Sequence, residues 1–473
     1  MSNATSADSM MTLQAAALAT HGSATQGDRQ FTGVSTDTRS IAAGELFVAL
    51  KGEHFDGHEY VRQALAQGAA AALVESAWAG LQDDQPPLIV VEDTRRALGD
   101  LAASWRARFA LPLIGITGSN GKTTVKEMCA HILCEQARRS RPDGDPAESR
   151  QSILVTEGNL NNDIGLPLTL LKLRSRHVAA VVEMGMNHPG EIAYLTHIAR
   201  PTVAVITNAQ RAHLEGLGGL AAVARAKGEI FAGLSPDGVA VINADDPHAA
   251  MWREMNRSRK VFSFGLTPAA DVTAGFTPLQ FGSLLRLVTP QGRPDREVPL
   301  DLPGKHNVAN ALAAAAATLA AGVPLEAIVA GLADFSGVKG RLQRRKARHG
   351  ALLIDDSYNA NPDSVRAAID VLAALQGKKI LVFGDMGEVG EQAGQFHDEI
   401  GGYAKSMGVD RMLALGEHAA AAARNFDGGA EHFKNVAALI DALLRLLDED
   451  TTVLVKGSRF MKMERVVEAI VEP

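Results

Sequence analysis

Short apolar runs alternate with segments of helical character along the chain, and this alternation constrains the fold more than any other feature. In the middle of the chain the runs occupy residues 113–117, 178–182, 203–206 and 239–242. Runs of this length, rich in β-branched residues and bounded by turn residues, are typical of strands buried in parallel sheets. The pattern predicts an α/β protein with helices covering its sheets.

Similar runs flank the middle region on both sides. Before it we expect strands at residues 44–50 and 86–91, and a linking helix over residues 94–109. After it, a second open sheet is predicted from the runs at residues 351–354, 379–383, 412–415 and 452–455. The length of 473 residues fits three domains at roughly 100–200 residues each. We predict an N-terminal α/β domain, a central mononucleotide-binding domain and a C-terminal Rossmann-like domain over residues 1–92, 93–335 and 336–473.

Composition excludes several classes of protein. The apolar share of 46% and the charged share of 21% are those of a globular chain. A net charge of −7 disfavours nonspecific binding to nucleic acid, which usually requires a basic face. Two cysteines are too few for a disulfide framework, and no apolar run is long enough to insert into a membrane. We therefore expect a cytoplasmic protein, and a monomer because no coiled coil or exposed apolar stripe is evident.

The strongest local signal is Thr117-Gly-Ser-Asn-Gly-Lys-Thr-Thr124, between an apolar strand and a helix expected near Val125. Glycines let a backbone wrap phosphates, and a helix N-terminus supplies aligned N–H donors. A lysine in this position reaches the terminal phosphates, and the next hydroxyl holds Mg²⁺. The glycine that usually opens a P-loop is shifted by one place, to Gly115. The alternative to a nucleotide-binding loop is a plain glycine turn. We predict nucleotide binding by Gly118, Ser119, Asn120, Gly121, Lys122, Thr123 and Thr124.

Acidic and imidazole side chains follow two of the central strands. Glu183 ends the run at residues 178–182, and His213 lies past the next strand. Ligands of open α/β sheets bind at this edge, where a carboxylate and an imidazole can share a Mg²⁺ with phosphates. Either residue could instead be an ordinary strand-end or loop residue. Periodicity alone makes Lys227 an exposed helical lysine.

Further polar clusters lie near the proposed boundary of the last domain. Residues 302–310 open an alanine-rich helix, and Asn310 could pair with a base edge or serve in a turn. Arg341 would place a cation across a nucleotide cleft. Residues 355–364 form a polar turn that could also be an extended N-cap with Asp363 or Ser364 as the cap. Residues 456–459 could bind an anion, whereas residues 135–151 are a solvated insertion with no expected chemistry.

These motifs together resemble the ATP-dependent Mur ligases, whose P-loop has the same shifted glycine. The resemblance spans nearly the whole chain, and it is greatest to the members that add D-alanyl-D-alanine. Two departures are the insertion at 135–151 and Gly387, where a larger apolar residue is expected. The greater similarity to the members that add D-alanyl-D-alanine rests on four segments, residues 156–167, 355–364, 383–390 and 455–461.

The resemblance implies a reaction and its ligands. UDP-N-acetylmuramoyl-tripeptide would be activated by ATP as an acyl phosphate and joined to D-alanyl-D-alanine, with closure about a hinge near residues 335–340 excluding water. Catalysis would involve Lys122, Glu183, His213 and Lys227. Two Mg²⁺ ions would bind Thr123, Glu183, His213 and Lys227, with Lys227 carbamylated as in many members. ATP would also contact Asn310, Arg341 and Asp356. The other substrates would contact Ser35, Thr38, Arg39, Lys51, Asn159, Asn161, Asn162, Tyr358 and Asn359.

Two other functions remain open at this point. A sibling Mur ligase or a folylpolyglutamate synthase would share the central domain, so only the N-terminal segments and residues 355–364 can separate them. A P-loop switch would bind nucleotide without a second substrate. Turnover of ATP that depends on an amine acceptor would exclude the switch.

Overall fold

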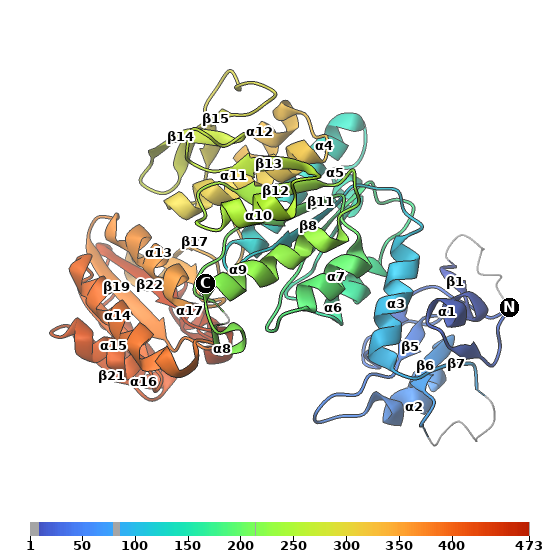
Figure 1. Ribbon diagram of the computed structural model, residues 1–473. Coiled ribbons are helices and arrows are strands. Elements are labelled where there is room, and N and C mark those ends of the chain that lie inside the picture. Colours follow the sequence, from blue (N-terminus) through green and yellow to red (C-terminus); the bar gives the residue numbers. More distant parts are fainter. Residues whose placement is uncertain (1–8, 79–85, 213, 473) are drawn as a thin grey trace.

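The computed structural model describes residues 9–78, 86–212 and 214–472, and it contains three α/β domains (Figure 1). The first domain and the last lie at opposite ends of the central one in this view. Within the described residues, no helix is long and apolar enough to cross a membrane. The three-domain α/β prediction is therefore confirmed, while the boundaries at 92/93 and 335/336 stay a prediction.

The N-terminal domain is built on a five-stranded sheet with the order β2-β7-β6-β5-β4. β2 (Ser23–Ala24) is antiparallel to β7, and the other neighbours are parallel. The remaining elements are β1 (Met11–Thr12), α1 (Leu13–Ala19), β3 (Gln30–Phe31), β4 (Val34–Ser35), β5 (Leu46–Val48), η1 (Gly57–Tyr60), α2 (Val61–Ala66), β6 (Ala71–Glu75) and β7 (Leu88–Val91).

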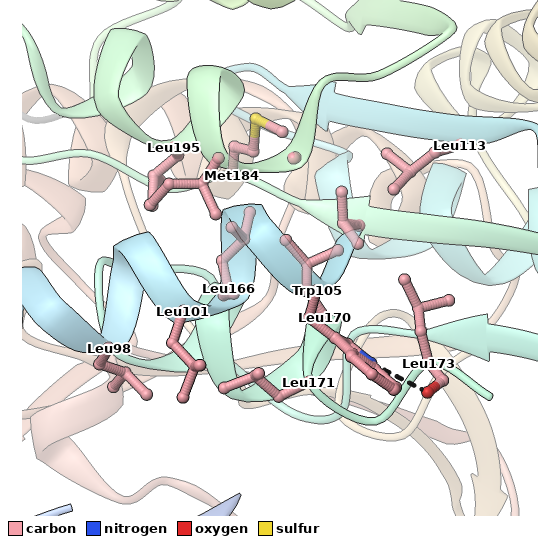
Figure 2. Packing of buried hydrophobic residues seen from close by; sticks show 14 of the residues in the cluster. Leu98, Leu101, Trp105, Leu113, Leu166, Leu170, Leu171, Leu173, Met184 and Leu195 are labelled. Atoms are coloured by element: carbon pink, nitrogen blue, oxygen red, sulfur yellow. Dashed lines mark hydrogen bonds between the residues drawn. The ribbon is translucent and has the colours of Figure 1, made fainter. Parts of the chain in front are cut away.

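The linking helix α3 (Thr94–Arg106) joins the first domain to the second through a continuous apolar core. Asp93 caps it by accepting from the backbone N–H groups of Arg95 and Arg96. Leu98 and Leu101 point toward leucines of the central domain, and the Trp105 indole N–H donates to the Leu173 carbonyl at 3.1 Å (Figure 2). In the central domain, α3 packs against α6 (Gly165–Leu170) and α7 (Glu191–Ala199).

The central sheet is fully parallel, with the order β13-β12-β11-β8-β10-β9. β8 (Leu113–Thr117) lies inside it between β11 and β10, and alternate residues of β8 face opposite layers of helices. The other strands are β9 (Ile153–Val155), β10 (Ala179–Glu183), β11 (Val203–Ile206), β12 (Val239–Asn243) and β13 (Lys260–Phe264). The helices are α4 (Lys122–Ser140), α5 (Pro146–Gln151), α8 (Leu214–Leu217), α9 (Leu220–Gly228), η3 (Glu229–Gly233), α10 (Ala249–Met255), α11 (Lys305–Ala320) and α12 (Leu325–Ala333).

Three details of this domain differ from the sequence prediction. The P-loop helix begins at Lys122 rather than near Val125, because Gly121 takes a left-handed conformation and acts as its N-cap. The insertion at 135–151 is largely helical, since it contains the end of α4 and all of α5. A three-stranded antiparallel sheet was missed; it consists of β14 (Thr273–Pro278), β15 (Ser283–Val288) and β16 (Val298–Leu300).

The C-terminal domain has the sheet order β17-β18-β22-β19-β20-β21. Only the edge strand β17 (Gln343–Lys346) is antiparallel to its neighbour. The other elements are η4 (Arg348–Gly350), β18 (Leu352–Asp356), α13 (Pro362–Ala373), β19 (Lys378–Gly384), η5 (Gly390–Gln392), α14 (Ala393–Ser406), β20 (Arg411–Leu415), α15 (Ala419–Phe426), β21 (Ala430–Phe433), α16 (Val436–Leu444), β22 (Thr451–Lys456), η6 (Arg459–Met461) and α17 (Glu464–Ile470).

The N-cap predicted for α13 was wrong by two or three residues. Asn361, not Asp363 or Ser364, is the cap: its side chain accepts from the Ser364 N–H, and the Ser364 hydroxyl accepts from the Asn361 N–H. Pro362 is the first helical residue, a position that suits proline because the N–H it lacks would have no helical partner.

Candidate active site

The loop after β8 turns sharply at two glycines. Gly118 and Gly121 have φ angles of 149° and 81°, which favour glycine. A Cβ on Gly118 would lie 1.9 Å from the Thr207 hydroxyl oxygen, and one on Gly121 would lie 2.3 Å from Asn310 Oδ1. The loop therefore packs against the end of β11 and the start of α11 too closely for any side chain.

The segment that follows β11 holds this loop in place. The backbone N–H of Ser119 donates to the Asn208 carbonyl at 3.0 Å, and that of Asn120 donates to Asn208 Oδ1 at 2.9 Å. The Ser119 hydroxyl donates to the Gln210 carbonyl at 3.0 Å. Residues 207–210 thus preorganise the P-loop, a role that their sequence did not reveal.

Lys122, the first residue of α4, folds back over the loop. Its ammonium group donates to the carbonyl oxygens of Gly118 at 2.7 Å and Ser119 at 3.2 Å. Burial lowers the pKa of Lys122, and nearby Arg341 lowers it further, whereas the Glu183 carboxylate opposes the shift. The cation therefore lies inside the strand–loop–helix turn that the sequence predicts to bind phosphates.

Oxygen ligands gather beside Lys122. The Thr123 hydroxyl donates to Glu183 Oε2 at 2.9 Å, and Asn161 Nδ2 donates to Glu183 Oε1 at 2.8 Å. Glu183 is buried at the end of β10, and Arg341 Nη2 donates to the Thr123 hydroxyl oxygen at 3.0 Å. Three predicted site residues and one predicted substrate contact, Asn161, thus meet at one point.

Lys227 near the end of α9 is fully buried, contrary to the exposed position that helical periodicity indicates. Its Nζ has no hydrogen-bond partner among the described residues. Burial holds the pKa of Lys227 well below its ordinary value, the positive charge of Lys122 lowers it further, and the Glu183 carboxylate opposes the shift. The Lys227 amine is thus buried, and it lies close enough to Lys122 and Glu183 for their charges to act on it.

The C-terminal domain contacts the P-loop directly. Asn361 Nδ2 donates to Asn120 Oδ1 at 2.7 Å. Next to this contact, the Arg211 guanidinium pairs with Asp363 at 2.7 Å and with Glu399 at 3.0 Å. Because these bonds join residues far apart in the sequence, nothing in the local pattern around Arg211 indicated them.

Polar residues at and just past the ends of β18 and β22 form the other wall. Lys456 Nζ donates to Asp356 Oδ2 at 2.6 Å and to the Asn359 carbonyl at 2.9 Å. The guanidinium carbon of Arg341 lies 4.4 Å from the ring centroid of Tyr358. The anion-binding role considered for residues 456–459 is thus weakened for Lys456, whose charge is balanced by Asp356.

A cavity of about 1410 Å³ lies between these two walls. It is lined by the P-loop and by residues of β14, α11 and α13. Asn310, Arg341, Asp356 and Asn359 all face it. This volume exceeds the range of roughly 300–1,000 Å³ typical of sites for one small ligand, so the cleft has room for more than a nucleotide.

The remaining predicted site residues lie elsewhere. Asn162 lies in the turn before α6, where its side-chain oxygen accepts from the Gly165 N–H at 2.9 Å, and Asn159 precedes it in the same turn. His213 lies outside the described residues. The predicted contacts of the N-terminal domain do not line the cavity; they are Ser35, Thr38, Arg39 and Lys51.

Arg39 pairs instead with a neighbour in its own turn. Its guanidinium donates to the Asp37 carboxylate at 2.6 Å, which holds the pKa of Asp37 at about 2. In the described part of the chain, no group of three or more histidine, cysteine, aspartate or glutamate side chains could hold a metal ion. An ion at Thr123 and Glu183 would therefore need oxygens from a ligand or water.

Comparisons with known proteins agree with this geometry. Three family profiles match: "Mur ligase family, catalytic domain" over residues 30–106, "Mur ligase middle domain" over 116–318, and "Mur ligase, glutamate ligase domain" over 340–459. A relative from Escherichia coli (strain K12), named UDP-N-acetylmuramoyl-tripeptide–D-alanyl-D-alanine ligase, is 46% identical over 445 residues, 93% of each chain.

Solved structures extend the agreement to three dimensions. MurF from Acinetobacter baumannii has a TM-score of 0.88 and 39% identity, covering 98% of this chain and 99% of its own. MurF ligase from Thermotoga maritima, in complex with ADP, has a TM-score of 0.79 and 27% identity, covering 92% of this chain and 96% of its own. The chain belongs to the Mur ligase family.

Proposed function

We propose that this chain is an ATP-dependent ligase that joins D-alanyl-D-alanine to UDP-N-acetylmuramoyl-tripeptide and releases ADP and phosphate. The observation that carries the proposal is the cleft whose walls are the P-loop and the C-terminal residues around Arg341 and Asn361. The Escherichia coli relative bears the name of this activity over almost the whole chain, and the Thermotoga maritima structure contains ADP. The product is the pentapeptide precursor of peptidoglycan.

The proposed chemistry needs positive charge at the P-loop. A carboxylate is a poor acyl donor, so the tripeptide carboxylate attacks the γ-phosphorus of ATP and becomes an acyl phosphate. Carboxylate and triphosphate repel each other, and Lys122 together with the loop N–H groups offsets this repulsion. The amine of D-alanyl-D-alanine then displaces phosphate. Closure of the C-terminal domain keeps water from the acyl phosphate.

The donor set fits Mg²⁺ as the metal. The Thr123 hydroxyl and the Glu183 carboxylate are hard oxygen ligands, and Mg²⁺ usually completes its shell with substrate phosphates and water. Bound Mg²⁺ would add positive charge beside the phosphates. We propose two ions, the second near His213.

The proposal further includes a modification, the carbamylation of Lys227. A neutral amine is the form that reacts with carbon dioxide, and burial lowers the pKa of Lys227, whose Nζ has no hydrogen-bond partner among the described residues, and so favours that form. The reaction forms a carbamate and releases a proton, which turns a buried amine into an anion. That anion would balance the positive charges of Lys122 and the metal.

Substrate contacts follow from the two walls of the cleft and from the family motifs. Asn310 would contact adenine, Arg341 a phosphate, and Asp356 the ribose. Asn359 lines the cleft, Tyr358 lies against Arg341, and both would contact a substrate. The UDP moiety would bind the N-terminal domain through Ser35, Thr38, Arg39 and Lys51, and the tripeptide arm would pass Asn159, Asn161 and Asn162.

One experiment tests the function. Phosphate release is measured with ATP, Mg²⁺ and UDP-N-acetylmuramoyl-tripeptide, with and without D-alanyl-D-alanine, and the product is identified by mass. Release that requires the dipeptide and yields the pentapeptide is the expected result. Release that requires another amino acid would indicate a sibling ligase, and release that ignores every acceptor would indicate a nucleotide switch.

A further inference from the structure

A lysine is buried between α4 and the segment that follows β9. Lys126 is only 1% exposed, although lysine side chains are almost never fully buried unless they are paired. Its ammonium group donates to the Thr156 carbonyl oxygen at 2.6 Å and pairs with the Glu127 carboxylate at 2.8 Å. Glu127 is the next residue of the helix, whereas Thr156 lies 30 positions along the chain. The buried cation is therefore compensated, and one of its bonds ties α4 to a distant segment.

Thr156 in turn holds the backbone of Glu183. β9 ends at Val155, which pairs with Val181 of β10. Beyond this pair, the buried Thr156 hydroxyl accepts from the Glu183 N–H at 3.0 Å. On the other side of β10, Glu183 pairs with Ile116 of β8. The backbone of Glu183 is thus fixed from both sides, by a strand on one side and by a threonine side chain on the other.

The segment that Thr156 begins also orients the Glu183 carboxylate. The side-chain amide of Asn161 donates to Glu183 Oε1 at 2.8 Å. The Asn161 carbonyl oxygen accepts from the Gly185 N–H at 2.8 Å, and a Cβ on Gly185 would lie 2.8 Å from Asn161 Oδ1. Any side chain on Gly185 would therefore displace this amide. Residues 156–161 fit closely around the end of β10 and set the direction of the carboxylate.

Helix α4 carries the other proposed metal ligand of this site. Thr123 lies three positions before Lys126, so the two residues are neighbours on one face of the helix. The Thr123 hydroxyl donates to Glu183 Oε2 at 2.9 Å. α4 therefore reaches Glu183 by two routes, directly through Thr123 and indirectly through Lys126 and Thr156. The P-loop helix and the carboxylate are joined into one unit.

We propose that Lys126 and Thr156 are positioning residues that hold Glu183 in place for Mg²⁺. The inference rests on the metal site of the proposed function, and it gives a role to a buried cation and a buried hydroxyl that lie outside the lining of the cleft. Mg²⁺ demands near-ideal octahedral geometry with bonds of about 2.0–2.1 Å, so a small displacement of one ligand weakens its binding. Residues that orient metal ligands typically change metal affinity by about 10–100-fold.

A role in packing alone predicts a different response to substitution. A threonine that only fills space can be replaced by valine, which has nearly the same shape. A lysine that only fills space can be replaced by methionine, which is also unbranched. The positioning role depends on the hydrogen bonds instead, so these two substitutions should impair the metal site while the fold is kept.

The test measures metal binding directly. Mn²⁺ suits the same oxygen ligands as Mg²⁺ and is paramagnetic, so electron paramagnetic resonance distinguishes bound from free ion. The dissociation constant of Mn²⁺ is measured on the full chain at a fixed concentration of ADP, with ADP alone as the blank. Thr156→Val removes the hydroxyl and should weaken Mn²⁺ binding by about 10–100-fold. Thr156→Ser keeps a hydroxyl and should bind Mn²⁺ nearly as tightly as wild type.

Lys126→Met tests the first link of the chain of bonds. Methionine cannot donate to Thr156, so Mn²⁺ binding should weaken here too. Lys172→Met is the matched control, because the Lys172 ammonium bonds at 2.9 Å to Glu157, the residue after Thr156, on the exposed surface. That variant should bind Mn²⁺ like wild type. Thermal unfolding shows whether each variant is folded, and if Lys126→Met is not, the two Thr156 variants decide.

Three results would overturn the inference. They are wild-type affinity for Mn²⁺ in Thr156→Val, an equal loss in Thr156→Ser and Thr156→Val, and an equal loss in Lys172→Met. Glu183→Gln separates these failures from failure of the proposed metal site. If Glu183→Gln binds Mn²⁺ as tightly as wild type, the ion does not bind at Glu183, and the site itself is wrong together with the inference.

Discussion

The two contacts that the central domain makes with its neighbours are of opposite character. Toward the N-terminal domain it shares an apolar core that continues from Leu73 and Ile89 through Leu98, Leu101 and Trp105 of α3 to the leucines of α6 (Figure 2). Toward the C-terminal domain the bonds are polar, and they surround a cavity. Large apolar interfaces hold domains together, whereas polar ones permit relative motion. The difference favours a hinge on the C-terminal side, as the sequence predicts near residues 335–340.

The largest expected effect is on the apolar contact. Trp105→Ala removes a buried indole and its hydrogen bond to Leu173, so the free energy of unfolding should fall by about 3–5 kcal/mol. Denaturant titration monitored by circular dichroism measures this. A loss below about 1 kcal/mol would contradict the view that α3 fastens the two domains.

Substitution of Lys227 tests the chemistry proposed for the central domain. Lys227→Ala should lower turnover about 10–100-fold, as removal of groups around a metal does, and short carboxylates such as acetate should restore part of it. Lys227→Arg, which keeps a long basic side chain but cannot be carbamylated, is the matched control and should not be rescued. Full activity in the alanine variant would remove Lys227 from the mechanism.

Arg211 tests the polar contact. Its pairs with Asp363 and Glu399 are partly exposed, so Arg211→Ala should change the free energy of unfolding by less than about 1 kcal/mol. Turnover should nevertheless fall several-fold, because the C-terminal domain loses its bonds to the segment that holds the P-loop. Arg257→Ala, which removes an exposed pair with Glu254, is the control. Unfolding that weakens more than catalysis would show that this contact fastens the domains as the apolar one does.

The smallest effect is a pH dependence of the same contact. Hydrogen bonding to Arg211 lowers the pKa of Glu399, and Arg366 adds to the shift. A lowered carboxylate pKa stabilises above the ordinary value of about 4.5 and loses that contribution as pH falls through the lowered pKa. Wild type should therefore lose slightly more unfolding free energy than Glu399→Gln below about pH 4.5. Identical pH profiles would contradict the pairing.

Structural features that depend on contiguous residues were predicted correctly from the sequence. β8, the P-loop and α4 were recognisable because strand, glycines and helix are contiguous. By contrast, the β14–β16 sheet was missed because its strands contain Gly275, Pro278 and Pro299, which weaken the strand signal.

Contacts between distant segments were beyond prediction from residue pattern alone. Periodicity alone placed Lys227 on an exposed helix face, yet the fold buries its side chain completely. Arg211 gave no sign of its partners, since Asp363 and Glu399 belong to another domain. The cap at Asn361 was misplaced because four candidate capping residues surround Pro362.

Hydrogen–deuterium exchange with and without a nonhydrolysable ATP analogue and UDP-N-acetylmuramoyl-tripeptide tests the central claim most directly. If the cleft is the active site and closes on its polar side, protection should rise together in residues 118–124, 207–212 and 356–364, while the core of α3 and α6 stays unchanged. Protection confined to the N-terminal domain, or absent from residues 356–364, would contradict the account.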